Sequence, residues 1–367
     1  MNEPIRILHI VGAMYPGGME NFIMNLYEKI DREKFQFDFV VHMRKEKDYG
    51  EQIEKMGGKV YVLPRLTKSP WKSLKQLYYI VKKNQYKIVI RHTANALIVP
   101  QLLVSKMAGA KIICHSHNET DPMKGIHKMG RLFMKAVTDA RLACSWKAGK
   151  WMFGGMDFKV IPNGISLSKF IFDLQKGDKI RREFNLKDKN IYGHIANFIE
   201  SKNHGYLLEI FKEITKLDEK AILFCLGEGD LRPEIEKRIE ELDLGKKVIL
   251  TGIRHDTDAF MSAMDLLIFP SLFEGLPLTL IEAQIAALPA IISDTITEEV
   301  VVTKDLIYRK SIREQPEKWA KLAVSIVKQR EKNDRKCQKE AIQRAGYDIC
   351  QIAKWYESFL VGLIEER

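Results

Sequence analysis

The sequence predicts an α/β fold made of two doubly wound domains, each with a parallel sheet between layers of helices. Short apolar runs alternate with amphipathic helical segments along nearly the whole chain, which is typical of parallel strands joined by helices. The chain has 367 residues, more than one hydrophobic core usually holds. The alternation also starts afresh after a polar stretch near residues 176–189, so we expect a second domain there.

The composition predicts a globular protein of a reducing compartment. Hydrophobic residues make up 46% and charged residues 29%, and no run of 18 apolar residues is long enough to span a bilayer. The apolar run at the N-terminus is too short for a signal peptide and leads directly into a strand. The five cysteines are scattered, without a C-x-x-C pair, which favours free thiols in the cytoplasm over disulfides or zinc.

The positive charge is confined to the first part of the chain. Residues 1–165 contain 27 basic and 14 acidic residues, a net charge of +13, whereas the remainder carries −2 of the total of +11. This asymmetry predicts an anionic partner for the first domain. No nucleic-acid-binding motif is present, so we expect an anionic lipid surface and not a nucleic acid.

A basic segment provides a candidate contact with such a surface. Basic side chains recur at helical intervals on one face of the helix expected at 123–134. They are Lys124, His127, Lys128, Arg131 and Lys135. Basic amphipathic helices bind membrane surfaces, although a solvated face over an ordinary core helix fits equally. A second candidate contact comprises Trp71, Lys72, Lys75, Lys82 and Lys83.

Two features of the first domain point to a ligand site. The expected strand at 5–11 leads through Gly12, Gly17 and Gly18 into a helix, an arrangement that suits a phosphate, although a simple tight turn is the alternative. The loop is not G-x-G-x-x-G, which argues against a dinucleotide site.

Histidines form the second feature. His115 and His117 lie two residues apart at the end of an expected strand, on one side of it, and His92 ends the preceding strand. A metal site needs a third ligand, which no fixed spacing provides, and a structural role is the alternative. We therefore predict no metal site.

Two carboxylates mark the second domain. The segment 264–294 reads as strand, loop, helix and strand, with Glu274 in the loop and Glu282 inside the helix. A loop at the carboxyl end of a parallel strand faces the ligand crevice of α/β folds. The backbone N–H groups of Leu278, Thr279 and Leu280 would lie at the helix N-terminus, which suits a phosphate. Glu282 is placed to accept hydrogen bonds from ribose hydroxyls, and Glu274 to reach another part of the same ligand.

The segment PSLFEGLPLTLIEAQ resembles the E-x7-E motif of the family 4 retaining glycosyltransferases, which have the GT-B fold of two Rossmann-like domains facing a central cleft. IVGAMYPGGME, CHSHN, IPNGIS and SKNH occur in the order of that family. The resemblance implies domains of residues 1–165 and 166–349, with a C-terminal helix of about 350–367 crossing back to the first. It also implies that Glu274 lies by the donor sugar and Glu282 holds the ribose.

Further roles follow from the same resemblance. His117 would act beside the transferred sugar together with Glu274, while His92 and His115 lie on the acceptor side. The loop with Gly17 and Gly18 would lie near the donor phosphate. Lys202 would bind the donor diphosphate, and Gly227 would lie beneath the base. Asn197 stands where the family usually has an arginine, and Arg254 is a candidate for the missing charge.

The resemblance implies a retaining transfer from a nucleotide-sugar, UDP-linked by expectation, to a saccharide or lipid-linked acceptor, without metal or other cofactor. We expect the protein in the cytoplasm, peripheral on the inner face of the plasma membrane. Three alternatives remain: a GT-B epimerase of nucleotide-sugars, a nicotinamide oxidoreductase, which the missing glycine fingerprint disfavours, and a catalytically silent membrane-surface module.

Overall fold

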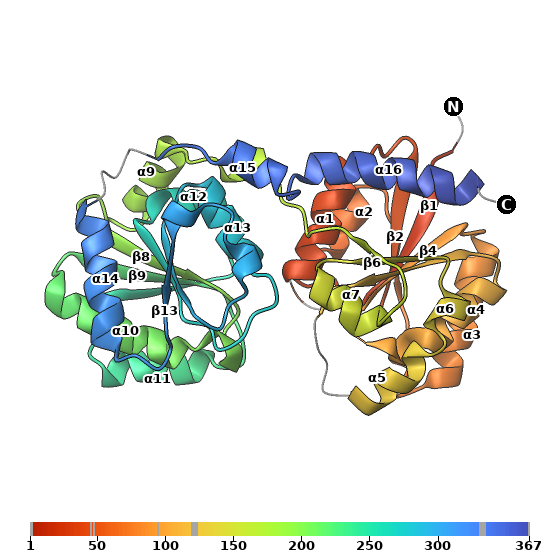
Figure 1. Cartoon of the computed structure of the whole chain (residues 1–367), viewed down its shortest axis with the longest axis horizontal. Coiled ribbons are helices and arrows are strands. Elements are labelled where there is room, and N and C mark those ends of the chain that lie inside the picture. The colour runs from red at the N-terminus through yellow and green to blue at the C-terminus, as the bar shows by residue number, and fades with distance from the viewer. Residues whose placement is uncertain are drawn as a thin grey trace. The chain divides into compact units, whose positions relative to one another are not determined.

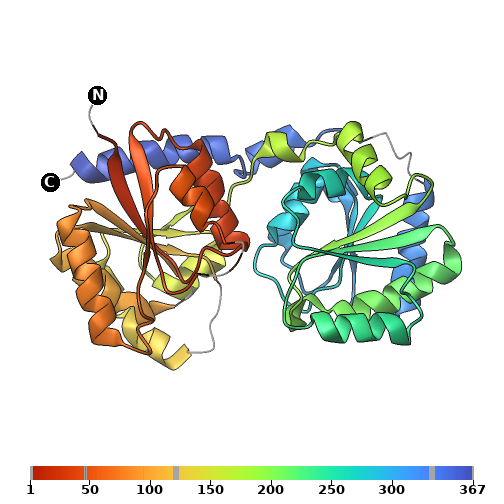
Figure 2. The same ribbon diagram turned by 180° about the vertical axis from the view of Figure 1, so that it is seen from behind.

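The computed structural model describes residues 3–44, 46, 48–93, 95–118, 124–329 and 335–365. The chain divides into two compact units: unit 1 comprises Met1–Ser166 and Gly346–Arg367, and unit 2 comprises Leu167–Ala345. Each unit is a parallel sheet with helices on both faces (Figures 1 and 2). The predicted α/β fold of two doubly wound domains is therefore confirmed.

The described part of unit 1 contains a seven-stranded sheet in the order β3-β2-β1-β4-β5-β6-β7. Its strands are β1 (Ile5–Ile10), β2 (Phe35–Val41), β3 (Val60–Val62), β4 (Ile88–Thr93), β5 (Lys111–Ser116), β6 (Ala140–Ala143) and β7 (Lys159–Val160). Its helices are α1 (Gly18–Lys29), α2 (Gly50–Lys55), α3 (Pro70–Lys83), α4 (Val99–Met107), α5 (Lys124–Arg131), α6 (Met134–Val137), α7 (Trp146–Phe153) and α16 (Ile349–Glu365). Strand order reverses between β1 and β4, where α/β folds commonly bind ligands.

Alternation along β1 divides the core of unit 1 into two layers. Ile7 and Val11 pack in the cluster that contains residues of α1 and α16, whereas Leu8 and Ile10 pack on the other face with residues of α3, α4 and α7. Successive side chains of a strand point to opposite faces, so a strand covered on both sides is apolar throughout.

The returning C-terminal segment joins unit 1 through backbone contacts. The N–H of Ile165 donates to the carbonyl of Tyr347 at 2.8 Å, and the N–H of Ile349 donates to the carbonyl of Ile165 at 3.1 Å. A Cβ atom at Gly164 would lie 2.5 Å from the side chain of Ile352, so glycine allows α16 to approach closely. α16 then lies beside α1 (Figure 1).

Unit 2 repeats the same winding. In its described residues the sheet has six strands in the order β10-β9-β8-β11-β12-β13. The strands are β8 (Asn190–Ile195), β9 (Ala221–Leu226), β10 (Val248–Gly252), β11 (Leu266–Phe269), β12 (Ala290–Ser293) and β13 (Ile307–Lys310). The helices are α8 (Leu167–Phe170), α9 (Leu174–Glu183), α10 (His204–Leu217), α11 (Arg232–Glu241), α12 (Thr257–Ala263), α13 (Leu278–Ile285), α14 (Pro316–Gln329) and α15 (Lys339–Arg344). In the part of the chain that the structure describes, no helix combines the length and apolarity needed to cross a membrane.

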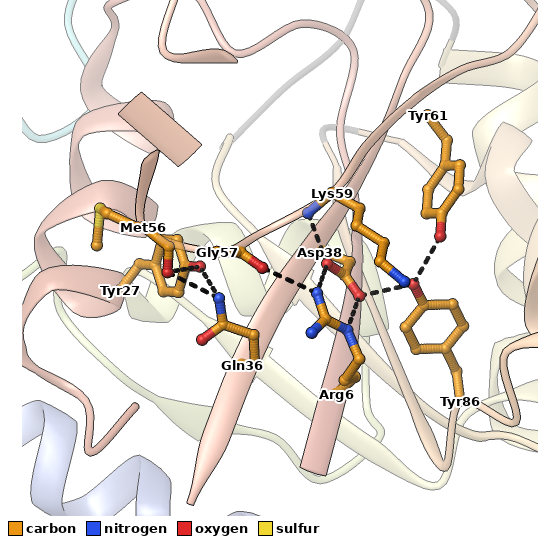
Figure 3. A network of polar contacts seen from close by, with 9 residues as sticks. All are labelled: Arg6, Tyr27, Gln36, Asp38, Met56, Gly57, Lys59, Tyr61 and Tyr86. Atoms are coloured by element: carbon orange, nitrogen blue, oxygen red, sulfur yellow. Dashed lines mark hydrogen bonds and ion pairs between the residues drawn. The ribbon is translucent and has the colours of Figure 1, made fainter. Parts of the chain in front are cut away.

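A buried carboxylate joins strands β1 and β2 to the residues that precede β3 and β4 (Figure 3). Asp38 on β2 is fully buried and accepts hydrogen bonds from Nε and Nη2 of Arg6 on β1, at 2.6 and 2.5 Å. The Tyr86 hydroxyl and the Lys59 backbone N–H each donate to it at 2.7 Å. A buried charge is tolerated only when it is paired and hydrogen-bonded, and Asp38 meets both conditions.

Asp38→Ala should therefore destabilise unit 1 by roughly 3 kcal/mol, because the Arg6 guanidinium and the Tyr86 hydroxyl lose their shared acceptor. Urea unfolding followed by circular dichroism measures this loss. The matched control is Lys34→Ala, which breaks an exposed ion pair with Asp31 and should leave the stability almost unchanged, because solvent screens that pair. Equal losses in the two variants would contradict the structural role of Asp38.

Candidate functional site

A glycine turn meets the loop after β8 at the carboxyl end of the unit 2 sheet. Gly227 has a φ of +145°, and a Cβ atom there would collide with the carbonyl oxygen of Ala196. The N–H of Phe198 donates to the carbonyl of Glu228 at 2.9 Å, which holds the turn and the loop together. Asn197 lies in this loop and is exposed. Glycine is thus required at position 227, and Asn197 faces solvent at this edge of the sheet.

Lys202 and Glu274 form an ion pair across 72 residues of sequence. Lys202 Nζ lies 2.5 Å from both carboxylate oxygens of Glu274, and the Ser271 hydroxyl donates to Glu274 Oε1 at 2.8 Å. The side chains are 17% and 8% exposed, so the pair is mostly shielded from solvent. The structure thereby brings two predicted site residues into direct contact and fixes the position of the carboxylate.

Backbone contacts hold the two loops that carry this pair. The N–H of Leu272 donates to the carbonyl of Ser201 at 2.8 Å, and Nδ2 of Asn203 donates to the carbonyl of Pro270 at 3.1 Å. Asn203 has a φ of +58°, a left-handed conformation that asparagine tolerates better than most residues. The loop after β8 and the loop after β11 therefore form one structural element.

The N-terminus of α13 lacks a side-chain cap. Its N-cap residue is Pro277, whose side chain cannot accept a hydrogen bond. The N–H of Leu280 donates to the carbonyl of Pro277 at 3.0 Å, so this predicted phosphate donor is engaged in the first turn. The N–H groups of Leu278 and Thr279 belong to the first turn, where no intrahelical partner exists, and suit an anion.

Glu282 lies one turn into α13 and is half-buried. Burial raises the pKa of Glu282 to about 7, opposed by the attraction of Lys169 and reinforced by the charge of Asp258. The carboxyl group is therefore close to half-ionised at neutral pH, and a ligand that donates hydrogen bonds to it would favour its ionised form.

Arg254 is engaged with carboxylates of its own unit. Its Nε and Nη2 donate to Asp256 at 2.8 and 2.7 Å, and Nη1 donates to Glu183 at 3.2 Å. The hydrogen bond to Asp256 raises the pKa of Arg254. The structure thus gives no support to the hypothesis that Arg254 replaces the charge that Asn197 lacks, because that charge is already balanced.

The glycine loop of unit 1 ends at α1. Gly17 is the N-cap residue with extended backbone, and Gly18, the first helical residue, is exposed. A Cβ atom at Gly17 would lie 2.7 Å from Oε2 of Glu20, so the carboxyl group of Glu20 folds back over its own helix N-terminus. Burial raises the pKa of Glu20 to about 7. An anion approaching the Gly17–Gly18 loop would therefore meet Glu20 first.

Four histidines gather at the carboxyl ends of β1, β4 and β5. Nδ1 of His9 lies 3.0 Å from Nε2 of His92, and Nδ1 of His92 lies 2.9 Å from Nε2 of His117. His115 stands opposite His92 in the strand register, and its Nδ1 lies 3.0 Å from the Tyr356 hydroxyl on α16. Sequence spacing offered no third ring beside His115 and His117, whereas the parallel pairing of β4 with β5 supplies His92.

Burial keeps these four imidazoles neutral. Desolvation lowers the pKa of His9 to about 3, and that of His117 to about 3 against an opposing contribution from Asn163. The pKa values of His92 and His115 fall well below the usual value for the same reason, with smaller contributions from neighbouring histidines. Each ring therefore has one N–H donor and one acceptor nitrogen at neutral pH.

The basic segment does not form the single helix that its spacing predicts. α5 ends at Arg131, and Lys135 lies on α6. His127 faces inward, because it accepts a hydrogen bond from the N–H of Ala96 at 3.1 Å and stacks on Trp151. Lys128 and Lys135 are exposed and Arg131 is half-buried, whereas the Lys124 side chain lies outside the described part. The expectation that His127 shares the basic face is wrong, since its ring satisfies buried backbone groups.

Three residues of these sites were not predicted. His9 lies in an apolar strand, and a polar residue among apolar neighbours is the feature of the sequence that could have identified it. Glu20 follows the glycine loop directly, where an acidic side chain at a helix start was visible. Tyr356 reaches His115 only through the packing of α16, which no local pattern reveals.

The chain matches two protein families. Residues 16–169 match the family Glycosyltransferase Family 4, and residues 176–344 match Glycosyl transferases group 1. It is 33% identical over 365 residues to the putative glycosyltransferase EpsF of Bacillus subtilis, covering 94% of each chain. It is 26% identical over 317 residues, 80% of each chain, to the UDP-Gal:alpha-D-GlcNAc-diphosphoundecaprenol alpha-1,3-galactosyltransferase of Escherichia coli.

A solved structure shares the fold at low sequence identity. The Anabaena protein Alr3699/HepE, in complex with UDP-glucose, superimposes with a TM-score of 0.77 at 15% identity. The alignment covers 97% of this chain and 99% of the Anabaena chain.

The raised pKa of Glu282 predicts a pH-dependent stability. Its folded pKa of about 7 exceeds the ordinary value of 4.5, so stability is full below pH 4.5 and is lost as pH rises through 7. Glu282→Gln should therefore stabilise unit 2 by on the order of 2 kcal/mol at pH 8 and by little at pH 5. Thermal unfolding at the two pH values measures this, with the exposed Glu299→Gln as control. The same gain at both pH values would contradict the assignment.

Proposed function

The chain belongs to the GT-B glycosyltransferases of the family 4 type, and we propose that it moves a sugar from a UDP-sugar to a hydroxyl of a saccharide or lipid-linked acceptor, with retention of anomeric configuration. Retention is what the family resemblance implies. The activity named for the Escherichia coli relative supports both a UDP-linked donor and an acceptor carried on diphosphoundecaprenol. Such an acceptor is typical of the assembly of bacterial surface polysaccharides, which is the process we assign.

One observation carries the proposal: the Lys202–Glu274 pair stands on loops joined to each other, beside the uncapped start of α13. An ammonium has three donors, so Lys202 can bind the donor diphosphate while one N–H continues to hold Glu274. Glu274 is thereby oriented toward the sugar that the same diphosphate carries. The N–H groups of Leu278 and Thr279 add the positive end of a helix to this anion site.

Glu282 completes the donor site in this proposal. Its ionised carboxylate accepts hydrogen bonds from both ribose hydroxyls, and binding draws its pKa down from about 7. Gly227 would lie beneath the base in this proposal, in a turn that requires glycine because a side chain there would collide with Ala196. Asn197 contributes a neutral hydrogen bond where an arginine would contribute charge, so Lys202 is the main cation on the diphosphate.

The leaving diphosphate develops negative charge as the sugar departs. We assign its stabilisation to Lys202 and the start of α13, with no metal or other cofactor in the transfer step. His117, neutral because it is buried, exchanges a hydrogen bond with a sugar hydroxyl near the reacting centre. His92 and His115 hold its ring from the acceptor side.

We also propose that unit 1 rests on an anionic membrane surface at the inner face of the plasma membrane, where a lipid-linked acceptor resides. The exposed apolar side chains of Met129, Leu132 and Phe133 lie among the exposed cations Lys128 and Lys135. Apolar side chains that enter the headgroup region beside cations are the combination that peripheral helices use. Trp71, which is 84% exposed, offers a second anchor on α3.

Nucleotide release from a panel of UDP-sugars, with and without a lipid-linked acceptor extract, tests the activity. Release that requires both a UDP-sugar and the acceptor, together with a labelled lipid-linked product, is the expected result. A sugar product formed without acceptor would identify an epimerase instead. No turnover of any donor would support a catalytically silent protein.

The two glutamates should fail in different ways. Glu282→Ala should weaken UDP binding by about 2–4 kcal/mol, because two charge-assisted hydrogen bonds are lost. Glu274→Ala should retain UDP affinity and lose turnover, because its contact is with the sugar. Calorimetry measures the affinity of each variant for UDP, and initial rates with the UDP-sugar identified in the nucleotide-release panel measure its turnover. Glu299→Ala, at an exposed position, is the control. Unchanged UDP affinity in Glu282→Ala would remove the ribose assignment.

Membrane binding should depend on the exposed apolar residues of unit 1. The double substitution Leu132→Asp and Phe133→Asp should reduce binding to vesicles of phosphatidylcholine mixed with phosphatidylglycerol by about tenfold or more. Binding of the unaltered protein should weaken as salt is raised. Leu217→Asp alters an exposed leucine of unit 2 and is the control. Equal binding to vesicles of phosphatidylcholine alone would contradict an anionic surface.

A further inference from the structure

We propose that His92, His115 and His117 form a binding site for one divalent d-block cation such as Zn²⁺. One ligand nitrogen from each ring lies within 4.8 Å of the others, and among the described residues this is the one cluster of three or more metal-ligating side chains. A tetrahedral zinc ion with bonds of about 2.1 Å needs nitrogens roughly 3.4 Å apart. Nδ1 of His92 and Nε2 of His117 are 2.9 Å apart, so these rings need to separate by roughly 0.5 Å, and nitrogens at the 4.8 Å limit of the cluster need to approach by about 1.4 Å.

In His92 and His115, the ring nitrogen that would not bind the cation already has a hydrogen-bond partner. Nε2 of His92 is held by Nδ1 of His9, which leaves Nδ1 of His92 facing His117. Nδ1 of His115 is held by the Tyr356 hydroxyl, and its Nε2, which is buried, has no hydrogen-bond partner among the described residues. Metal-binding histidines characteristically have the second nitrogen fixed in this way, which sets the tautomer and the direction of the ligand lone pair.

The His117 ring has Asn163 as a neighbour that could accept a hydrogen bond from it. Nδ1 of His117 and Oδ1 of Asn163 are both buried, and in the described part of the chain neither has a hydrogen-bond partner. Asn163 lies close enough to His117 for a weak side-chain hydrogen bond to raise the pKa of His117, although the two atoms do not have normal hydrogen-bonding geometry. With a cation on Nε2 of His117, the proton moves to Nδ1, where the Asn163 oxygen can accept it. Binding would therefore strengthen a contact that lacks normal hydrogen-bonding geometry without the cation.

The donor chemistry selects the class of cation. Neutral imidazoles suit Zn²⁺, Cu²⁺, Ni²⁺ and Co²⁺, whereas Mg²⁺ and Ca²⁺ require oxygen ligands. Three histidines leave a fourth position open to water or to an anionic group. His92 and His115 are buried and His117 is half-buried, so that fourth position faces the His117 side.

The site has a consequence for the transfer reaction, which rests on the proposed function. A cation on Nε2 of His117 would replace the contact of that nitrogen with His92 and fix the ring, so the ring could no longer turn toward a sugar hydroxyl. The cation is therefore a competitor of the substrate and not a cofactor, and the transfer step itself remains independent of metal.

Cobalt binding to the full chain tests the site directly. The protein is prepared without a histidine tag, in a Cys337→Ser and Cys350→Ser background that removes the two exposed thiols, and is treated with a chelator. One equivalent of Co²⁺ should produce the visible d–d absorption of a tetrahedral nitrogen site, and Zn²⁺ should displace it. No such spectrum at millimolar Co²⁺, together with no heat of Zn²⁺ binding by calorimetry, would overturn the proposal.

Variants separate this site from other histidines. His115→Gln should abolish the Co²⁺ spectrum, and Tyr356→Phe should weaken Co²⁺ binding by about tenfold, because only the outer partner is lost. The matched control is His204→Gln, which alters a buried histidine of unit 2 whose ring contacts the ring of His194 edge to face. Circular dichroism shows whether each variant is folded, and if His115→Gln is not, His92→Gln replaces it. An unchanged spectrum in a folded cluster variant would contradict the assignment.

Inhibition of the transfer reaction by Zn²⁺ provides a separate test of the proposed competition. Zn²⁺ should inhibit transfer by the unaltered protein and inhibit the Tyr356→Phe variant about tenfold less, because that variant keeps all three histidines and loses only the partner of His115. Equal inhibition of the two would show that zinc acts elsewhere and would contradict the proposed competition. The spectroscopic result does not require any transfer activity, so failure of the proposed function and failure of the metal site are distinguishable.

Discussion

Parallel strand pairing is the constraint on which both candidate sites depend. Parallel strands end at the same edge of a sheet, so loops far apart in sequence converge there. In unit 1 the pairing of β4 with β5 sets His92 opposite His115. In unit 2 the loops after β8 and β11 meet in the same way and bring Lys202 to Glu274. The chemistry of each site is therefore set by the side chains that lie together at that edge of its sheet.

Burial then acts differently on the two sets of groups. In unit 1 it removes charge, because desolvated imidazoles lose their protons and are held by one another and by Tyr356. In unit 2 the Lys202–Glu274 ion pair is mostly shielded from solvent, and burial raises the pKa of Glu282 against the opposing attraction of Lys169. One unit therefore gathers neutral imidazoles at its sheet edge, and the other holds a fixed carboxylate beside an uncapped helix start.

The basic segment shows where local periodicity is insufficient. Its helical spacing was correct up to Arg131, but the chain ends α5 there and turns before α6. The ring of His127 then packs inward, because the N–H of Ala96 and the carbonyl of Trp151 lie within hydrogen-bonding distance of it. Periodicity describes one helix at a time, whereas the direction of a polar side chain also depends on unpaired backbone groups of neighbouring elements.

The sequence by itself determined the α/β class, the two windings and, outside the basic segment, most of the elements that carry the candidate residues, because strand and helix periods are local properties of the chain. It also determined that Glu274 and Glu282 flank one helix start. Only the tertiary structure decided that Lys202 pairs with Glu274, that Arg254 is already neutralised and that His9 and Tyr356 support the histidine cluster. Those contacts join residues up to 241 positions apart, and no local pattern specifies which distant side chains a shared sheet edge will bring into hydrogen-bonding distance.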